Sequence, residues 1–229
     1  MKFTKIILAL GLLFSFAKAD GQFIPRVGLG LGSHYAWGYD TGIYNEDDTM
    51  VVAGRLGLLY ATESYFVDLG FEGYSYDSST YGFVVNGVIV DHTQTEMSLT
   101  GGINFYKQMY FIAGYKTTYF GDGYFNDDYA TQSGPFIGLS INNLTMGNDR
   151  QDIFSYSLAY QFIGDMSYNS AASAVGSEDS TGINMKFTYR RAGSNFSYDL
   201  KYQLTESDDV LMSYSILMLG VNYNFTNLF

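Results

Sequence analysis

Apolar and polar residues alternate along most of this chain. From Phe196 to Leu204 every second residue is apolar or aromatic, and the residues between them are polar or charged. Successive side chains of a β-strand point to opposite faces, so this segment is predicted to be a strand with one apolar and one polar face. The same alternation, with aromatic residues on the apolar face, recurs about ten times.

These recurrences predict ten strands, with the odd-numbered positions Val27, Leu29 and Leu31 on the apolar, outward face of the first one. The strands are expected at Phe23–Trp37, Met50–Ala61, Tyr65–Tyr76, Thr93–Tyr106, Tyr110–Phe120, Pro135–Asn143, Ile153–Asp165, Gly182–Arg190, Asn195–Leu204 and Val210–Phe225.

The N-terminus has the pattern of a secretory signal peptide. Lys2 and Lys5 precede an apolar run over residues 6–16, and Ala17-Lys18-Ala19 follows it. The apolar run is too short to cross a bilayer as a helix. We therefore expect cleavage near Ala19, which leaves residues 1–19 as the signal peptide and 20–229 as a single domain.

The export signal and the alternation together predict an all-β fold. No later segment has the ~18 unbroken apolar residues of a membrane helix, and the chain has no cysteine to form disulfides. A closed barrel pairs every backbone group with a neighbouring strand. We expect one antiparallel up-and-down transmembrane β-barrel of about ten strands, with eight or twelve as the alternatives.

The connections between these strands alternate in length. The segments 61–64, 107–109 and 191–194 are short and are expected to be periplasmic turns, whereas the longer polar connections are expected to be extracellular loops. Two connections depart from the alternation, because 144–152 is long for a turn and 205–209 is short for a loop. Within the segment 77–92, Asn86-Gly87 lies between β-branched runs. This predicts a projecting hairpin with Asn86-Gly87 at its tip.

The last predicted strand ends in a distinctive way. Val221, Tyr223, Phe225 and Phe229 share one face after Gly220, with Asn227 interrupting the row. This ending resembles the terminal strand of Gram-negative outer-membrane β-barrel proteins. The resemblance implies an outer-membrane location, contact with outer-membrane lipid and lipopolysaccharide, and recognition of these five residues by the barrel-assembly machinery.

Charge is distributed unevenly between the two ends of the expected barrel. The chain has a net charge of −11, and the expected loops contain acids but no lysine or arginine. A field of this sign attracts cations and repels anions, which argues against nucleic acid as a partner. The alternative is a merely solvated loop surface. The loop acids are Asp40, Glu46, Asp47, Asp48, Asp77, Asp91, Asp122, Asp127, Asp128, Asp165, Glu178, Asp179, Glu206, Asp208 and Asp209.

Two loop segments offer oxygen ligands for a divalent cation. Glu46, Asp47 and Asp48 follow one another in the first loop, and Asp127 and Asp128 are adjacent in another. Carboxylate oxygens suit calcium or magnesium, although neither segment has the spacing of a calcium-binding loop. We expect weak binding of divalent cations or of a basic surface ligand, and no cofactor.

Charged residues also fall on the inward face of the expected strands. Arg55 is expected between Asp68 and Glu72, because cross-strand neighbours of opposite sign stabilise a sheet. The remaining inward charges are predicted to pair with one another and to fill the lumen, and they are Glu96 with Lys116, Lys186 with Asp199, and Lys201.

The two histidines are the only candidates for catalysis. His34 points inward near the outer end of the first strand, but Ser33 faces the opposite side and cannot form a dyad with it. His92 adjoins Asp91, a pairing that would resemble the outer-membrane aspartyl-type proteases, but no local motif supports it.

Three functions are therefore compatible with the sequence. The first is a non-enzymatic surface protein whose acidic, tyrosine-rich loops serve surface interaction or membrane integrity. The second is a narrow porin-like channel for small solutes or cations. The third is an outer-membrane lipid or peptide hydrolase using His34 or His92.

Overall fold

The computed structural model describes residues 21–40, 43–76, 83–85, 88–90, 93–120, 129–146, 152–169, 177–207 and 213–226. No helix among these residues is long and apolar enough to cross a membrane. The strands in this part of the chain are β1 (Gln22–Asp40), β2 (Ile43–Ala61), β3 (Tyr65–Tyr76), β4 (Phe83–Val85), β5 (Val88–Val90), β6 (Thr93–Tyr106), β7 (Met109–Phe120), β8 (Tyr129–Met146), β9 (Asp152–Asn169), β10 (Ser177–Arg190), β11 (Phe196–Ser207) and β12 (Ser213–Asn224).

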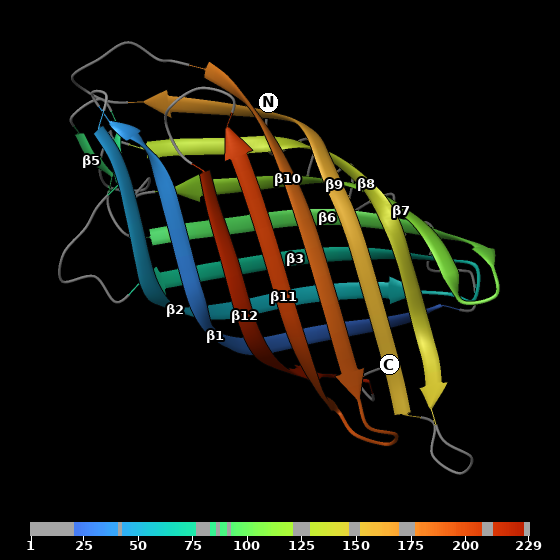
Figure 1. Ribbon diagram of the computed structural model, residues 1–229. Helices are drawn as coiled ribbons and strands as arrows, with labels where there is room; N and C mark the ends of the chain where they lie inside the picture. The colour runs from blue at the N-terminus through green and yellow to red at the C-terminus, as the bar shows by residue number, and fades with distance from the viewer. Residues whose placement is uncertain are drawn as a thin grey trace.

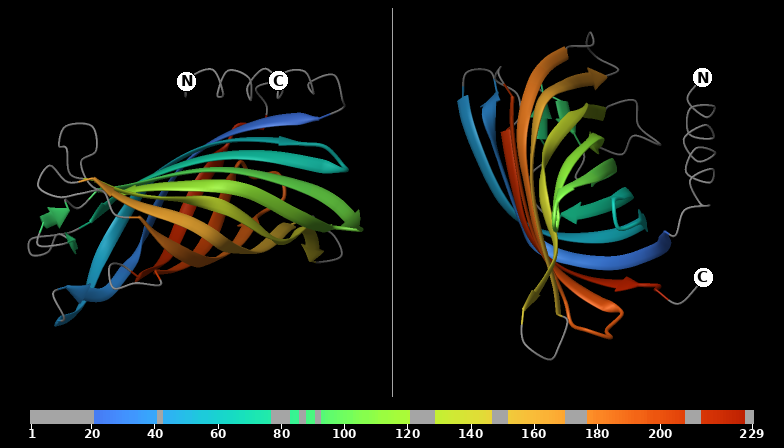
Figure 2. Two further views of the ribbon diagram at one scale, coloured as in Figure 1. Left: turned by 90° about the horizontal axis from the view of Figure 1, so that it is seen from above. Right: turned by 90° about the vertical axis from the view of Figure 1, so that its right-hand side faces the viewer.

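Ten of these strands close into one antiparallel barrel. Each strand except β4 and β5 pairs with its neighbours in chain order, and β12 returns to pair with β1, for example at Leu31 and Leu219. The strands slant and curve round into a single wall (Figure 1; Figure 2). The predicted all-β, ten-strand, up-and-down barrel is confirmed.

The predicted strand limits match the structure at two strands and differ at the other eight. β3 and β6 begin and end as predicted. β2 and β8 are longer than predicted, because backbone pairing continues through polar residues that break the apolar alternation. In β8 the predicted start at Pro135 was wrong, since the strand begins at Tyr129 and passes the proline at a register shift between Ser133 and Phe136.

The barrel has two distinct ends. At one, which we call the turn end, the short connections 62–64, 107–108 and 191–195 join successive strands. Gly193 has a φ of 70° there, a conformation that glycine adopts without strain. The two ends of the described chain also meet at the turn end, where the Phe225 amide donates to the Pro25 carbonyl at 2.9 Å.

The opposite end, where β1 leads to β2 and β7 to β8, is the loop end. The connection between β8 and β9 also lies at the turn end, and it is shorter than the predicted 144–152 because β8 continues to Met146.

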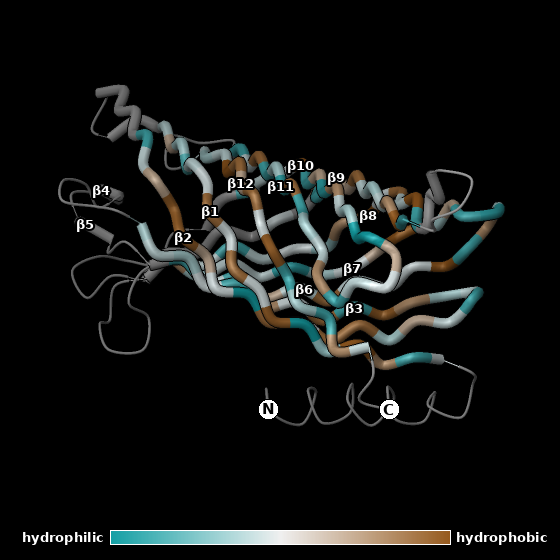
Figure 3. Tube along the Cα trace, turned by 90° about the horizontal axis from the view of Figure 1, so that it is seen from below, coloured by the Kyte–Doolittle hydropathy of each residue, from teal (hydrophilic) through white to brown (hydrophobic). Residues whose placement is uncertain are grey.

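The outer surface of the barrel is apolar. Leu29 (68% exposed), Leu219 (67%) and Ile103 (67%) are among many large apolar side chains that point away from the lumen. Apolar and polar residues alternate along the strands in Figure 3. A water-soluble surface rarely exposes so continuous an apolar area, whereas a barrel in lipid requires one. The outward face predicted for Val27, Leu29 and Leu31 is confirmed.

The predicted hairpin within 77–92 is present as a separate small sheet. β4 pairs antiparallel with β5, and the pairing of Val85 with Val88 leaves two residues between them. This sheet is separate from the sheet of the barrel, and residues 77–82 and 91–92, which link it to β3 and β6, lie outside the described residues. Asn86 and Gly87 themselves lie outside the described residues.

We expect Leu200→Arg to impair membrane insertion far more than Glu206→Arg. Both residues lie on the outward face of β11, but Leu200 is near the middle of the strand and Glu206 is near the loop end. An arginine facing lipid costs about 2–4 kcal/mol at the bilayer midplane and about 0–1 kcal/mol near the interface. The folded fraction, read from the heat-dependent mobility of each variant on a gel, measures the difference. Equal folded fractions would contradict the assignment of Leu200 to the lipid-facing band.

Candidate functional site

A layer of charged side chains crosses the middle of the lumen. We call it the charged layer, and it consists of Arg55, Glu72, Glu96, Lys116, Lys186, Asp199 and Lys201. Arg55 Nη1 lies 2.6 Å from Asp199 Oδ2, and Arg55 Nε lies 3.6 Å from Glu72 Oε1. Because the charges are removed from bulk water, each requires a partner of opposite sign or several hydrogen bonds.

Lys201 is the centre of this layer. Its ammonium group lies 2.8 Å from Glu72 Oε2, 3.0 Å from Glu96 Oε1 and 2.8 Å from the Tyr74 hydroxyl, so all three of its donors are used. Glu96 lies on β6 and Lys201 on β11, with four strands between them on either side of the barrel. The ion pair between Lys201 and Glu96 therefore joins opposite walls of the lumen.

The sequence-based pairing is reproduced in part. Arg55 approaches Glu72, Lys116 Nζ lies 3.7 Å from Glu96 Oε2, and Lys186 Nζ lies 3.9 Å from Asp199 Oδ2. The expected contact between Arg55 and Asp68 is replaced, because Asp68 forms its ion pair with Arg26 instead. Arg26 lies near the turn-end start of β1, and its side chain reaches inward past Gly57.

The pairing of Arg55 with Asp199 was missed by the sequence analysis. These residues lie on β2 and β11, and β1 and β12 stand between them. Gly30 of β1 and Gly220 of β12 are directly paired. A Cβ atom on Gly220 would overlap both Arg55 and Asp199, and one on Gly30 would lie 3.2 Å from Arg55 Nη2. The absence of side chains at Gly30 and Gly220 leaves the space in which Arg55 contacts Asp199. Both glycines are visible in the sequence, but their pairing becomes apparent only once the strand register is known.

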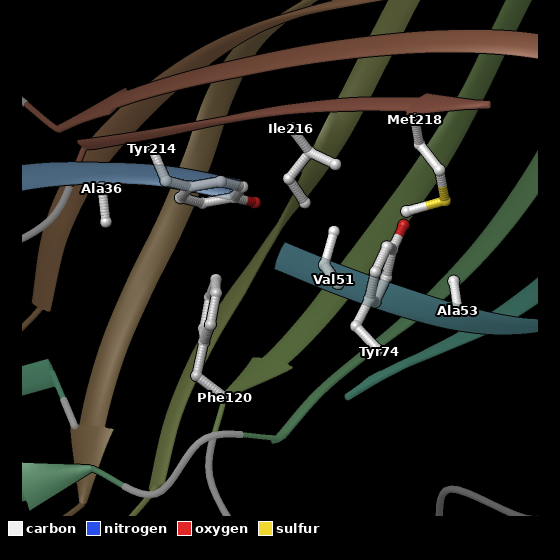
Figure 4. Packing of buried hydrophobic residues seen from close by; sticks show 8 residues of the cluster. All are labelled: Ala36, Val51, Ala53, Tyr74, Phe120, Tyr214, Ile216 and Met218. Carbon is white, nitrogen blue, oxygen red and sulfur yellow. The ribbon is translucent and has the colours of Figure 1, made fainter. Parts of the chain in front are cut away.

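An aromatic and aliphatic cluster fills the lumen on the loop-end side of the charged layer. We call it the aromatic plug, and it contains His34, Val51, Tyr76, Phe120, Tyr214, Ile216 and Met218. The Phe120 and Tyr214 rings lie 5.5 Å apart and point toward one another (Figure 4). Since β7 and β12 stand on opposite walls, this contact also spans the lumen.

Polar side chains connect the plug to the charged layer. The Tyr214 hydroxyl lies 3.2 Å from Gln132 Oε1. In the orientation that satisfies both ends of its amide, Gln203 donates to Glu96 Oε2 at 2.9 Å and accepts from Lys116 Nζ at 2.9 Å. Gln203 is fully buried between the two layers. A network with most of its members hydrogen-bonded stiffens a buried region, so the two layers form one rigid filling.

A second apolar cluster lies toward the turn end. Tyr110, Ile112, Phe136 and Ala159 are buried together, and the Phe66 ring lies 5.5 Å from that of Tyr110. These residues come from β3, β7, β8 and β9. The lumen of the described barrel is therefore occupied by side chains on both sides of the charged layer.

The structure places the candidate catalytic residues apart. His34 is 1% exposed and lies between the rings of Tyr76 (4.8 Å) and Tyr214 (5.5 Å). Ser33 faces outward and donates to Asp48 Oδ1 at 2.6 Å, so the two side chains point to opposite faces as expected. His92, Asp77 and Asp91 lie outside the described residues.

Of the predicted divalent ligands, only Asp48 has a described side chain. The prediction that Glu46, Asp47 and Asp48 lie in a loop was wrong, because all three lie in β2, where Glu46 and Asp47 pair through their backbones with Trp37 and Ala36. Asp127 and Asp128 lie outside the described residues. Within the described part of the chain, no group of three or more His, Asp or Glu residues could hold a metal ion.

The residues of the expected assembly signal lie along the turn-end half of β12. Val221 is exposed on the outer surface, and the Tyr223 and Phe225 rings are in contact at 4.8 Å. Gly220 leaves space in the lumen for Arg55 and Asp199, as described above. Phe229 lies outside the described residues. Recognition by an assembly machinery remains a proposal for these residues.

A cavity of about 770 Å³ opens at the turn end. Its lining includes Gln22, Glu63, Lys107 and Asn142. None of the lining residues belongs to the charged layer, the aromatic plug or the predicted ligand set.

No protein-family model and no curated protein matches the sequence. Solved structures with a similar fold include the outer-membrane protease OmpT from Escherichia coli, which is 10% identical with a TM-score of 0.40 over 91% of this chain and 98% of that one. A mutant of the monoaromatic hydrocarbon channel TodX is 10% identical with a TM-score of 0.37 over 92% of each chain. Neisserial surface protein A is 9% identical with a TM-score of 0.36 over 87% and 97%. These similarities are too low to indicate a function.

We expect Asp199→Ala to destabilise the barrel by about 3–5 kcal/mol, because it leaves Arg55 buried beside an empty position. The double variant Arg55→Met with Asp199→Ala should be more stable than the sum of the two single changes implies, since it removes both charges of the pair. Urea unfolding of the refolded protein in micelles gives these free energies. Asp68→Ala is the control, since its pair with Arg26 is partly exposed and is worth about 0–1 kcal/mol. Strict additivity of the Arg55 and Asp199 changes would contradict the pairing.

Proposed function

We propose that this protein is a non-enzymatic outer-membrane barrel that acts through its loop-end surface rather than by conducting solutes. The observation that supports this most directly is the pair of contacts between opposite walls. Lys201 meets Glu96 in the charged layer, and Phe120 meets Tyr214 in the aromatic plug.

A conducting lumen would need these contacts to be absent or to break readily. Barrels of about eight strands are filled by side chains, whereas those of about 16–18 strands leave an aqueous bore. Here ten strands enclose two apolar clusters and a layer of ion pairs. Separating Lys201 from Glu96 removes the closest ion pair of Glu96 and leaves that carboxylate with Lys116 at 3.7 Å, which costs free energy inside the lumen. The narrow-channel alternative therefore has little support from the lumen.

The loop end is the surface where we place the activity. The acids of the expected loops are unaccompanied by lysine or arginine in the sequence. Clustered carboxylates repel one another and attract cations, so the chemistry suits divalent ions or a partner with a basic surface. Binding of this kind serves either adhesion or cross-linking of neighbouring anionic lipopolysaccharide at the membrane surface.

The burial of His34 argues against its use in the hydrolase alternative. His34 is enclosed by Tyr76 and Tyr214, which leaves it out of reach of a lipid or peptide at the barrel surface. Only His92 then stays available for such chemistry. Loss of a lipase or peptidase activity on His92→Ala, with none on His34→Ala, would replace the proposed function with this alternative.

We expect the wild-type barrel to be closed to small solutes and the double variant Phe120→Ala with Tyr214→Ala to leak. The change removes both rings of the contact that spans the lumen at the plug. Swelling of proteoliposomes in small sugars, together with planar-bilayer conductance, measures the leak. Tyr119→Ala is the control, because Tyr119 precedes Phe120 on the same strand but faces outward. Steady conductance of the wild-type protein would overturn the proposal of a closed lumen.

We expect replacement of Glu46, Asp47, Asp48, Asp127 and Asp128 by their amides to reduce calcium-dependent thermal stabilisation or partner adhesion. A divalent ion relieves the repulsion between clustered carboxylates, and the amides carry no charge. The variant should still fold, because backbone pairing in β2 does not depend on these side chains. The measurements are the melting temperature with and without calcium, and binding to cells or immobilised partners. If calcium affects neither protein and adhesion is unchanged, the acidic loops serve solubility only.

A further inference from the structure

Among the side chains that the structure describes, those that face the lumen include more positive than negative groups. Among the described residues, the inward-facing cations are Arg26, Arg55, Lys116, Lys186, Arg190 and Lys201, and the inward-facing carboxylates are Asp68, Glu72, Glu96 and Asp199. Arg190 belongs to the inward set because it alternates with Lys186 along β10 and pairs in register with Ser197, which is buried on the inner face. Within this described set of side chains, the cations outnumber the carboxylates by two.

The ion pairs show which two cations are in surplus. Asp68 pairs with Arg26, Glu72 with Lys201 and Arg55, and Glu96 with Lys201 and Lys116. Asp199 accepts from Arg55 at 2.6 Å through Oδ2 and from Asn222 at 2.8 Å through Oδ1. Every inward carboxylate that the structure describes therefore has a closer partner than Lys186 or Arg190.

Lys186 and Arg190 have weak or no partners of opposite sign. Lys186 lies 3.9 Å from Asp199 Oδ2, beyond hydrogen-bonding distance and behind the closer Arg55. No described carboxylate lies within ion-pair distance of Arg190. The Lys186 side chain is 38% exposed, whereas the side chains of Arg55, Lys116 and Lys201 are 5–9% exposed. Lys186 is thus more exposed than any of the four cations that have a close carboxylate, including Arg26 at 22%.

Both residues lie on the turn-end half of β10, with Thr188 between them on the same face. Their Cα atoms are roughly 13 Å apart along the strand. The lysine and arginine side chains are long enough to reach toward each other across this distance. The charged layer and the plug separate this position from the loop end. An ion from the loop end would have to pass both, so the turn end, toward which Arg190 lies, is the shorter approach to this position.

We propose that Lys186 and Arg190, with the Thr188 hydroxyl between them, bind a small free oxyanion that enters the lumen from the turn end. Arginine forms paired hydrogen bonds to phosphate and carboxylate oxygens, and lysine adds a point charge. The bound anion compensates the two positive charges that the inward carboxylates leave over. The site is independent of the proposed surface function, since it lies at the other end of the barrel from the acidic loops.

The test uses inorganic phosphate as the probe. The refolded full-length protein in a maltoside detergent, which contains no phosphate, is titrated with phosphate against chloride at matched ionic strength, and the melting temperature and calorimetric heat are recorded. We expect saturable stabilisation by phosphate but not by chloride. Lys186→Gln with Arg190→Gln should weaken binding at least tenfold. Arg191→Gln, an equal loss of charge at the neighbouring exposed position, should leave binding unchanged.

Two further results decide the proposal. Without phosphate, the Lys186→Gln and Arg190→Gln variant should melt at the same temperature as the wild-type protein or higher, because a surplus of like charge is removed. A large loss of stability would show that both cations are already paired and would overturn the proposal. A phosphate response shared by all three proteins would overturn it too, as would stabilisation by phosphatidylglycerol in mixed micelles without any response to free phosphate.

Discussion

The pairing of every strand with two neighbours is the constraint on which the rest of the structure depends. In lipid an unpaired backbone group costs several kcal/mol, so a sheet must close on itself. The return of β12 to β1 achieves this closure. Closure at ten strands then fixes a lumen narrow enough for side chains of opposite walls to meet, as Lys201 and Glu96 do. The filling of the lumen is therefore a consequence of how the wall closes.

The filling combines two kinds of interaction with different demands. The aromatic plug packs apolar rings and needs only complementary shape, whereas the charged layer needs a partner for each ion. Gly30 and Gly220 supply the space in which Arg55 reaches Asp199, and Gln203 joins the layer to the plug. Polar groups of this kind fix the packing because only one arrangement satisfies them. In the proposed function, a lumen filled in this way leaves the loop-end surface and the two mouths as the places where ligands bind.

The two mouths differ in sign. The expected loops are acidic in sequence, while Lys186 and Arg190 leave positive charge in the turn-end half of the lumen. Such a polarity attracts cations to one side of the membrane and small anions to the other. In the proposed function, the side chains that fill the lumen keep these two attractions separate. The two ends of the barrel therefore differ in the sign of the ions that we propose they attract.

The sequence alone determined the wall of the barrel, and the tertiary structure decided its contents. Alternation with a period of two specifies strands, their faces and hence which charges point inward, because it is a local property of extended chain. It also predicted the contacts of Arg55 with Glu72 and of Lys116 with Glu96, since these residues lie on adjacent strands. It could not predict Arg55 with Asp199, Lys201 with Glu96 or Phe120 with Tyr214. Those contacts cross the lumen, and they depend on the slant and closure of all ten strands together.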